Sequence, residues 1–217
     1  MADEVLEQLK AGILKFQSNV YPELRETFEQ AVAVPQAPKT LIITCADSRI
    51  DPELITQSGP GELFTTRNIG NMIPAYPEML GGVSAVLEYA VSVVKVKHVV
   101  VCGHMDCGAM KALMDPASLE GIPSVKSWLR LADTALRITR STAPEGEKPE
   151  DFMRRLTEQN VLLQMKHLQT HPSIAEGMAR GELTISGWVY DIGSGGVRIS
   201  EDANPAFHPV EAEVVAG

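Results

Sequence analysis

The sequence predicts an α/β fold, in which a mainly parallel sheet is flanked by helices and ends in an antiparallel edge pair. Apolar segments of strand length alternate with longer segments of helical periodicity, and this alternation is typical of parallel strands joined by helices. The last two strand-like segments, 183–192 and 196–200, flank a Gly-Ser-Gly turn. Such a short glycine-containing connection indicates a hairpin, so the final strand is expected to run antiparallel.

The chain begins with a predicted helical arm. Apolar side chains recur every three or four positions over residues 3–18, and a second helical segment covers 22–33 before two prolines interrupt the pattern. The stripe consists of Val5, Leu9, Ile13 and Phe16. An apolar stripe needs a cover, either the chain's own core or a neighbouring subunit. We therefore expect a single domain, 1–217, made of an arm over 1–35 and an α/β core over 36–217.

The core alternates strands and helices in chain order. Its expected strands are 41–44, 63–66, 98–103, 183–192 and 196–200. Its expected helices are a short one after a cap at Asp51, one over 78–94, one from a cap at Asp106 to Met114, and two over 124–139 and 151–169. The segments 41–44 and 98–103 are apolar or β-branched almost throughout, as strands buried on both faces should be.

The composition limits the classes of partner and the location. The 217 residues include 19 basic and 28 acidic side chains, a net charge of −9. This charge argues against nucleic acid and anionic membranes as partners, because both attract a basic face. We find no signal peptide, and no segment approaches the roughly 18 apolar residues of a membrane span. Three cysteines are too few for a secreted disulfide framework, so we expect reduced thiols in a cytoplasmic protein.

Two predicted strands end in residues that can bind a metal. Cys45 ends the strand at 41–44, while His104 and Cys107 form an H-x-x-C unit after the strand at 98–103. Thiolate and imidazole are the ligands that zinc prefers, and three protein ligands leave the open position of a catalytic site. A lone H-x-x-C unit is weak evidence, because a buried cysteine at a strand end is usually a small hydrophobic residue. We interpret Cys102 in that second way.

Asp47 and Arg49 lie in the loop that follows the first of these strands. An exposed Asp–Arg pair usually contributes almost nothing to stability. The alternative is that Arg49 fixes the carboxylate of Asp47, which then accepts a hydrogen bond from a metal-bound hydroxide and aims its lone pair.

Three motifs in this order resemble the β-class carbonic anhydrases. They are C-A-D-S-R at 45–49, G-E-L-F-x-x-R-N at 61–68 and G-H-x-x-C-G at 103–108, and G-W-V-Y-D at 187–191 extends the resemblance toward the C-terminus. The resemblance implies a zinc enzyme that interconverts carbon dioxide and bicarbonate. It also implies a four-stranded parallel sheet with an antiparallel edge strand. The oligomer is expected to be a homodimer or a homotetramer, in which a neighbouring chain completes the active site.

The resemblance also assigns roles to single residues. Cys45, His104 and Cys107 would hold one Zn²⁺ per chain, Asp47 and Arg49 would form the catalytic pair, and Gly108 would offer its backbone N–H to the substrate. The substrate pocket of the family's plant-type branch corresponds to Gln36, Phe64, Ile69 and Tyr89, partly from the second subunit. Phe64, Ile69 and Tyr89 could equally be core residues.

One departure from the family's pattern bears on regulation. Members with an inhibitory bicarbonate site carry a tryptophan three residues before the first cysteine, where this chain has Ile42, although Arg67 and Tyr190 match that site. With Gln36 present and the tryptophan absent, the sequence resembles the members whose active site is constitutively open.

The expected reaction is attack on carbon dioxide by zinc-bound hydroxide, which forms near neutral pH because zinc lowers the pKa of its water. Carbon disulfide or carbonyl sulfide hydrolysis on the same fold remains an alternative. So does a zinc-stabilised, non-catalytic scaffold, against which the Asp47–Arg49 pair argues. A zinc dehydrogenase is disfavoured, because no G-x-G-x-x-G follows any predicted strand. The remaining histidines are interpreted as surface or packing residues: His98, His167, His171 and His208.

Overall fold

The computed structural model describes residues 2–201 and 204–211, whose strands form one six-stranded sheet in the order β2-β1-β3-β4-β5-β6. The expected α/β fold is confirmed: β1, β2, β3 and β4 are mutually parallel, and β5 pairs antiparallel with β4. The strands are β1 (Thr40–Cys45), β2 (Leu63–Asn68), β3 (His98–His104), β4 (Thr184–Tyr190), β5 (Val197–Glu201) and β6 (Asn204–Pro209).

The edge strand β6 was not predicted, and it pairs antiparallel with β5. Its sequence contains Pro205 and Pro209, which cannot donate a hydrogen bond to a ladder. Proline is tolerated at a sheet edge, where one side of the strand needs no partner, and this explains why the pattern did not indicate a strand.

The central strands are buried as expected, and α8 (Pro149–Gln169) covers one face of β3 and β4. Glycine allows this close approach. A Cβ atom on Gly187 would lie 2.6 Å from Cγ1 of Val161 and 2.7 Å from Sδ of Met165, both side chains of α8. The same face packs against α4 (Gly82–Tyr89) and α9 (Pro172–Ala179), the latter a short helix that was not predicted.

The remaining helices differ from expectation mainly at their ends. Asp51 caps α3 (Pro52–Thr56) by accepting a hydrogen bond from the Leu54 N–H, as predicted. The helix expected over 78–94 begins only at Gly82, because Gly81 is in an extended conformation, and it continues through a π-helical turn over Ala90–Val94. The segment 124–139 is divided by a 3₁₀ turn into α6 (Pro123–Leu129) and α7 (Asp133–Ser141).

The predicted cap at Asp106 is wrong. The N-cap of α5 (Gly108–Met114) is Cys107, and Asp106 has a left-handed backbone with φ of 62°. The side chain of Asp106 instead pairs with Arg49 and Lys111. Ion pairs with Arg49 and Lys111 therefore take the place of the expected capping hydrogen bond to the helix backbone.

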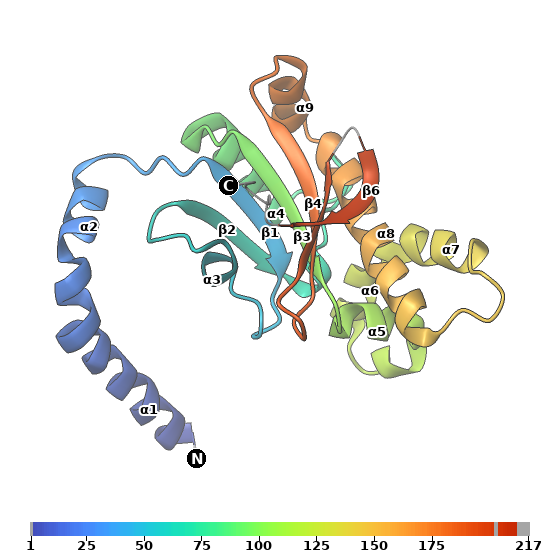
Figure 1. Ribbon diagram of the computed structural model, residues 1–217, viewed down its shortest axis with the longest axis horizontal. Coiled ribbons are helices and arrows are strands. Elements are labelled where there is room, and N and C mark those ends of the chain that lie inside the picture. Colours follow the sequence, from blue (N-terminus) through green and yellow to red (C-terminus); the bar gives the residue numbers. More distant parts are fainter. Residues whose placement is uncertain (1, 202–203, 212–217) are drawn as a thin grey trace, which may run out of the picture.

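The arm consists of α1 (Ala2–Lys15), a π-helical turn (Phe16–Val20) and α2 (Tyr21–Ala33), and it extends away from the sheet (Figure 1). Its apolar stripe is exposed, with Leu9 61% and Ile13 56% accessible. The chain's own core therefore does not cover the stripe. Among the described residues, no helix is both long and apolar enough to cross a membrane.

Candidate metal centre

The side chains of Cys45, His104 and Cys107 meet at the carboxyl edge of the parallel strands. Cys45 ends β1, His104 ends the adjacent strand β3, and Cys107 precedes α5. Their ligand atoms all lie within 4.8 Å of one another, and all three residues are buried. Residues that are 59 positions apart in sequence thus converge because β1 and β3 are neighbours.

The histidine is arranged as a metal ligand. Nδ1 of His104 lies 2.9 Å from the Met105 carbonyl oxygen and donates its proton there, so the proton is on Nδ1 and a lone pair is on Nε2. Nε2 is buried and has no hydrogen-bond partner among the described residues. A buried acceptor facing two sulfur atoms fits a cation, and a carbonyl that fixes the other ring nitrogen is the usual support for a ligating histidine.

The two sulfur atoms shift each other's pKa in opposite directions. The thiol of Cys107 donates to the sulfur of Cys45, which lowers the pKa of Cys45 and raises that of Cys107. Backbone N–H groups also point at both sulfurs: those of Gly70 and Asp47 at Cys45, and those of Ala109 and Met110 at Cys107. The third cysteine is not part of the group that could hold a metal, and burial raises the pKa of Cys102 to about 12, which keeps it a thiol.

Asp47 is held beside the three candidate ligands by Arg49. The Arg49 guanidinium binds both carboxylate oxygens, with Nε 2.9 Å from Oδ1 and Nη2 2.7 Å from Oδ2. The Arg49 side chain and backbone N–H hold the pKa of Asp47 well below its usual range. Oδ2 of Asp47 also lies 4.0 Å from Nε2 of His104, so the carboxylate faces the candidate site.

Two further residues support this pair, and sequence reasoning did not assign them this role. Asp106 accepts a hydrogen bond from Nη1 of Arg49 at 2.8 Å, so the guanidinium lies between two carboxylates. Arg67 on β2 donates to the carbonyl oxygens of Cys45 (3.1 Å) and Asp47 (2.6 Å), which anchors the loop backbone. The only available signals were the position of Asp106 beside Cys107 and the match of Arg67 to the family's motif.

The structure brings only part of the expected substrate pocket to the metal centre. Ile69 follows β2 at the same edge as Cys45, and Gly108 is the first residue of α5. Phe64 stacks on Tyr89 with ring centroids 6.1 Å apart, but its strand partner is Leu41. Cys45 lies four residue steps beyond Leu41, which places Phe64 roughly 13 Å from that edge.

Gln36 lies still farther back along the chain. It is exposed and precedes the amino end of β1, whereas the metal centre lies beyond the carboxyl end. Within one chain, Gln36, Phe64 and Tyr89 are therefore separate from the metal-binding group.

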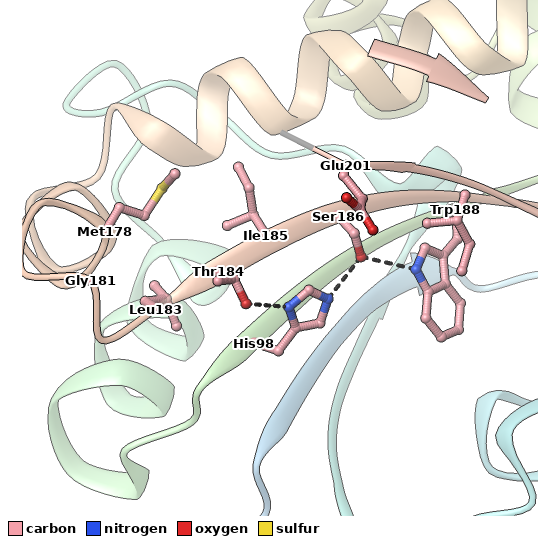
Figure 2. Close-up of a pocket in the computed structure, with 10 residues that line it drawn as sticks. His98, Met178, Gly181, Leu183, Thr184, Ile185, Ser186, Trp188 and Glu201 are labelled. Atoms are coloured by element: carbon pink, nitrogen blue, oxygen red, sulfur yellow. Dashed lines mark hydrogen bonds between the residues drawn. The ribbon is translucent and has the colours of Figure 1, made fainter. Parts of the chain in front are cut away.

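A cavity of about 650 Å³ lies on the opposite face of the sheet from α8, beside β3, β4 and β5 (Figure 2). Its polar side chains bind one another: His98 contacts Thr184 at 2.7 Å and Ser186 at 2.8 Å, and Nε1 of Trp188 donates to Ser186 at 2.9 Å. Burial lowers the pKa of His98, which favours its neutral form. These groups satisfy one another, so the chemistry is expected at the cysteine and histidine side chains instead.

The fold and the site together define an α/β protein with a metal-binding group at the carboxyl edge of its parallel strands. Comparison with known proteins identifies the family within this class. A family model described as carbonic anhydrase matches residues 40–197. A carbonic anhydrase from Pseudomonas aeruginosa is 44% identical over 211 residues, which cover 95% of this chain and 94% of that protein.

Solved structures agree with the sequence matches. The β-carbonic anhydrase CcaA aligns with a TM-score of 0.90 and 37% identity, covering 97% of this chain and 94% of that one. A tetrameric β-carbonic anhydrase from Sordaria macrospora aligns with a TM-score of 0.70 and 28% identity, covering 97% and 98%. The chain belongs to the β-class carbonic anhydrases. Its reaction is accordingly the reversible hydration of carbon dioxide to bicarbonate, and these matches lend no support to the two alternatives left open by the sequence.

Proposed function

We propose that Cys45, His104 and Cys107 bind one Zn²⁺ per chain and that carbon dioxide is hydrated at this site. The observation that carries the proposal is that Nε2 of His104 is buried with no hydrogen-bond partner among the described residues, in a ring whose ligand nitrogen lies within 4.8 Å of both sulfurs. Two sulfurs and one imidazole suit zinc better than harder cations, and three ligands leave one position open. Bound zinc supplies hydroxide from water near neutral pH.

Asp47 and Arg49 form the proposed catalytic pair. As a carboxylate, Asp47 can only accept hydrogen bonds, and its Oδ2 faces the site. It can therefore accept a hydrogen bond from a hydroxyl group held at the site and so direct an oxygen lone pair toward carbon dioxide. Arg49 restrains Asp47 by two side-chain hydrogen bonds, which keeps the carboxylate from turning inward to become a fourth ligand.

The proposed substrate pocket is shared between two copies of the chain. Ile69 and the N–H of Gly108 lie at the metal edge of one copy, whereas Gln36, Phe64 and Tyr89 would serve a neighbouring copy. The support is their separation from the metal centre within one chain and the exposure of Tyr89, which is 46% accessible. A homodimer or homotetramer would also cover the stripe of the arm, and a relative from Sordaria macrospora is described as tetrameric.

The same proposal places the enzyme in the cytoplasm as one domain, with 1–35 as the arm and 36–217 as the core. Its support is that Cys45, Cys102 and Cys107 are all unpaired, which suits a reducing compartment.

The test measures zinc content together with stopped-flow hydration of carbon dioxide. We expect about one zinc per chain, and we expect Cys45→Ser to lose both zinc and activity. Cys102→Ala is the matched control and should keep both, because Cys102 lies outside the ligand group. A zinc-free preparation that hydrates carbon dioxide at the wild-type rate would overturn the proposal.

A further inference from the structure

Side chains of α8 bind the backbone of the segment that follows β2, where the backbone of a strand would bind a neighbouring strand. Residues 70–74 are buried, yet the segment belongs to no strand. Polar side chains at successive turns of α8 bind its backbone: Asn160 donates to the Gly70 carbonyl at 3.2 Å, Gln164 accepts from the Ile73 N–H at 2.8 Å, and Nδ1 of His167 donates to the Ile73 carbonyl at 2.8 Å. His167, interpreted from sequence as a surface or packing residue, thus has a specific partner.

Gly70 is the point where this segment reaches the metal centre. Its N–H donates to the sulfur of Cys45, and its φ of +77° is a left-handed conformation that favours glycine. A Cβ at this position would lie 2.9 Å from Cβ of Ala109 and 3.0 Å from Cε of Met72. The backbone at Gly70 can therefore approach the sulfur of Cys45 closely, but glycine alone does little to fix the direction of its N–H group.

Side chains from two helices supply that direction. Nε1 of Trp128 on α6 donates to the Ile69 carbonyl at 2.9 Å. The Ile69 carbonyl and the Gly70 N–H belong to one planar peptide group, so a bond that fixes the oxygen also aims the N–H. Asn160 holds the carbonyl of the next peptide group, and Gln164 donates to Oδ1 of Asn160 at 3.0 Å.

We propose that Trp128, supported by Asn160, is a positioning residue that aims the Gly70 N–H at the Cys45 sulfur and thereby sets how strongly this ligand donates to the metal. The inference rests on the proposed metal centre. An N–H bond to a ligating sulfur withdraws part of its charge and orients it, and loss of such an outer partner typically weakens metal binding about 10–100-fold.

The chain offers a matched pair of substitutions, since it has two tryptophans. Trp128→Phe removes the indole N–H but keeps an aromatic ring, and Trp188→Phe removes the N–H that binds Ser186 in the cavity away from the metal (Figure 2). Zn²⁺ affinity is measured by competition with a chelator. The sulfur-to-metal charge-transfer band is measured after loading with Co²⁺, because this band responds to the charge on the sulfur and is not a measure of stability.

We expect Trp128→Phe to weaken Zn²⁺ binding about 10–100-fold and to move the Co²⁺ band to longer wavelength. Trp188→Phe should match the wild type in both. Suppose that the Trp128→Phe protein has a lower melting temperature than the wild type. If it nevertheless keeps the wild-type Zn²⁺ affinity and Co²⁺ charge-transfer band, the role of Trp128 is merely structural and the inference is overturned. A wild-type chain that binds neither metal would instead overturn the proposed function.

A second measurement needs no variant and covers the case in which Trp128→Phe does not fold. In the ¹⁵N-labelled wild-type chain loaded with ¹¹³Cd²⁺, the Gly70 amide proton should couple to cadmium through the sulfur of Cys45. Absence of this coupling in a cadmium-loaded protein contradicts the proposed N–H contact.

Discussion

The guanidinium of Arg49 binds both carboxylate oxygens of Asp47, at 2.9 and 2.7 Å, and leaves Oδ2 of Asp47 facing the buried candidate ligands. Asp106 contacts the same guanidinium from the other side. Arg49 therefore cannot follow Asp47 freely toward the three candidate ligands. This arrangement explains how a carboxylate can lie near a cation site and still remain available to a substrate.

Asp47→Asn should keep the metal and slow turnover. The asparagine has a similar shape, but its amide can bring a donor to a position where the proposed reaction needs a hydrogen-bond acceptor, and poor orientation of the attacking group costs about 100-fold in kcat. Metal content and stopped-flow hydration provide the measurement. Asp191→Asn is the control, since the side chain of Asp191 binds Gly193 and Ser194 within the β4–β5 turn. An unchanged kcat in Asp47→Asn would exclude the proposed role.

Metal binding at neutral pH should release about one proton from the two thiols, not two. The pKa of Cys45 is lowered and that of Cys107 is raised, because the Cys107 thiol donates to the Cys45 sulfur. Only Cys107 must then lose a proton, so affinity should rise with pH by about tenfold per unit. Titration calorimetry in buffers of different ionisation enthalpy counts the protons. Release of two thiol protons would show that the sulfurs do not share one.

Gly187→Ala should destabilise the core. The added Cβ would lie 2.6 Å from Val161 and 2.7 Å from Met165, and such overpacking costs about 1–3 kcal/mol. Urea unfolding of the metal-loaded protein measures the free energy of unfolding. Gly12→Ala in α1 is the control, because nothing lies within 4 Å of its added Cβ. If Gly187→Ala unfolds at the wild-type urea concentration, α8 does not pack as closely as described.

Two inactive variants should restore activity to each other when they are refolded together. Cys45→Ser lacks the metal but carries intact Phe64 and Tyr89, whereas Phe64→Ala/Tyr89→Ala carries the metal but lacks the aromatic pair. If the pair serves the neighbouring copy, a mixed dimer has one complete site, and an equal mixture should reach about a quarter of wild-type activity. Each variant refolded alone is the control. A mixture no more active than the average of the two would place the pair outside the partner's site.

Much of the fold was predictable because its signals are local. The segments 41–44 and 98–103 are apolar or β-branched almost throughout, and the Gly-Ser-Gly turn predicts a hairpin whatever lies around it. The start of α4 and the strand β6 were missed. Gly81–Gly82 and the prolines of 204–209 weaken the local pattern, and only packing and pairing with distant residues decide the outcome.

The candidate metal-binding group could be inferred from the order of its residues along the chain, since Cys45 and the H-x-x-C unit both follow buried parallel strands, whose carboxyl ends share one edge. Motif spacing carries no information about the residues that orient them. Asp106 contacts Arg49 across 57 positions, Trp128 contacts Ile69 across 59, and Asn160 contacts Gly70 across 90. Those contacts exist because helices and loops far apart in sequence pack at one edge of the sheet, and the direction of a hydrogen bond is decided only there.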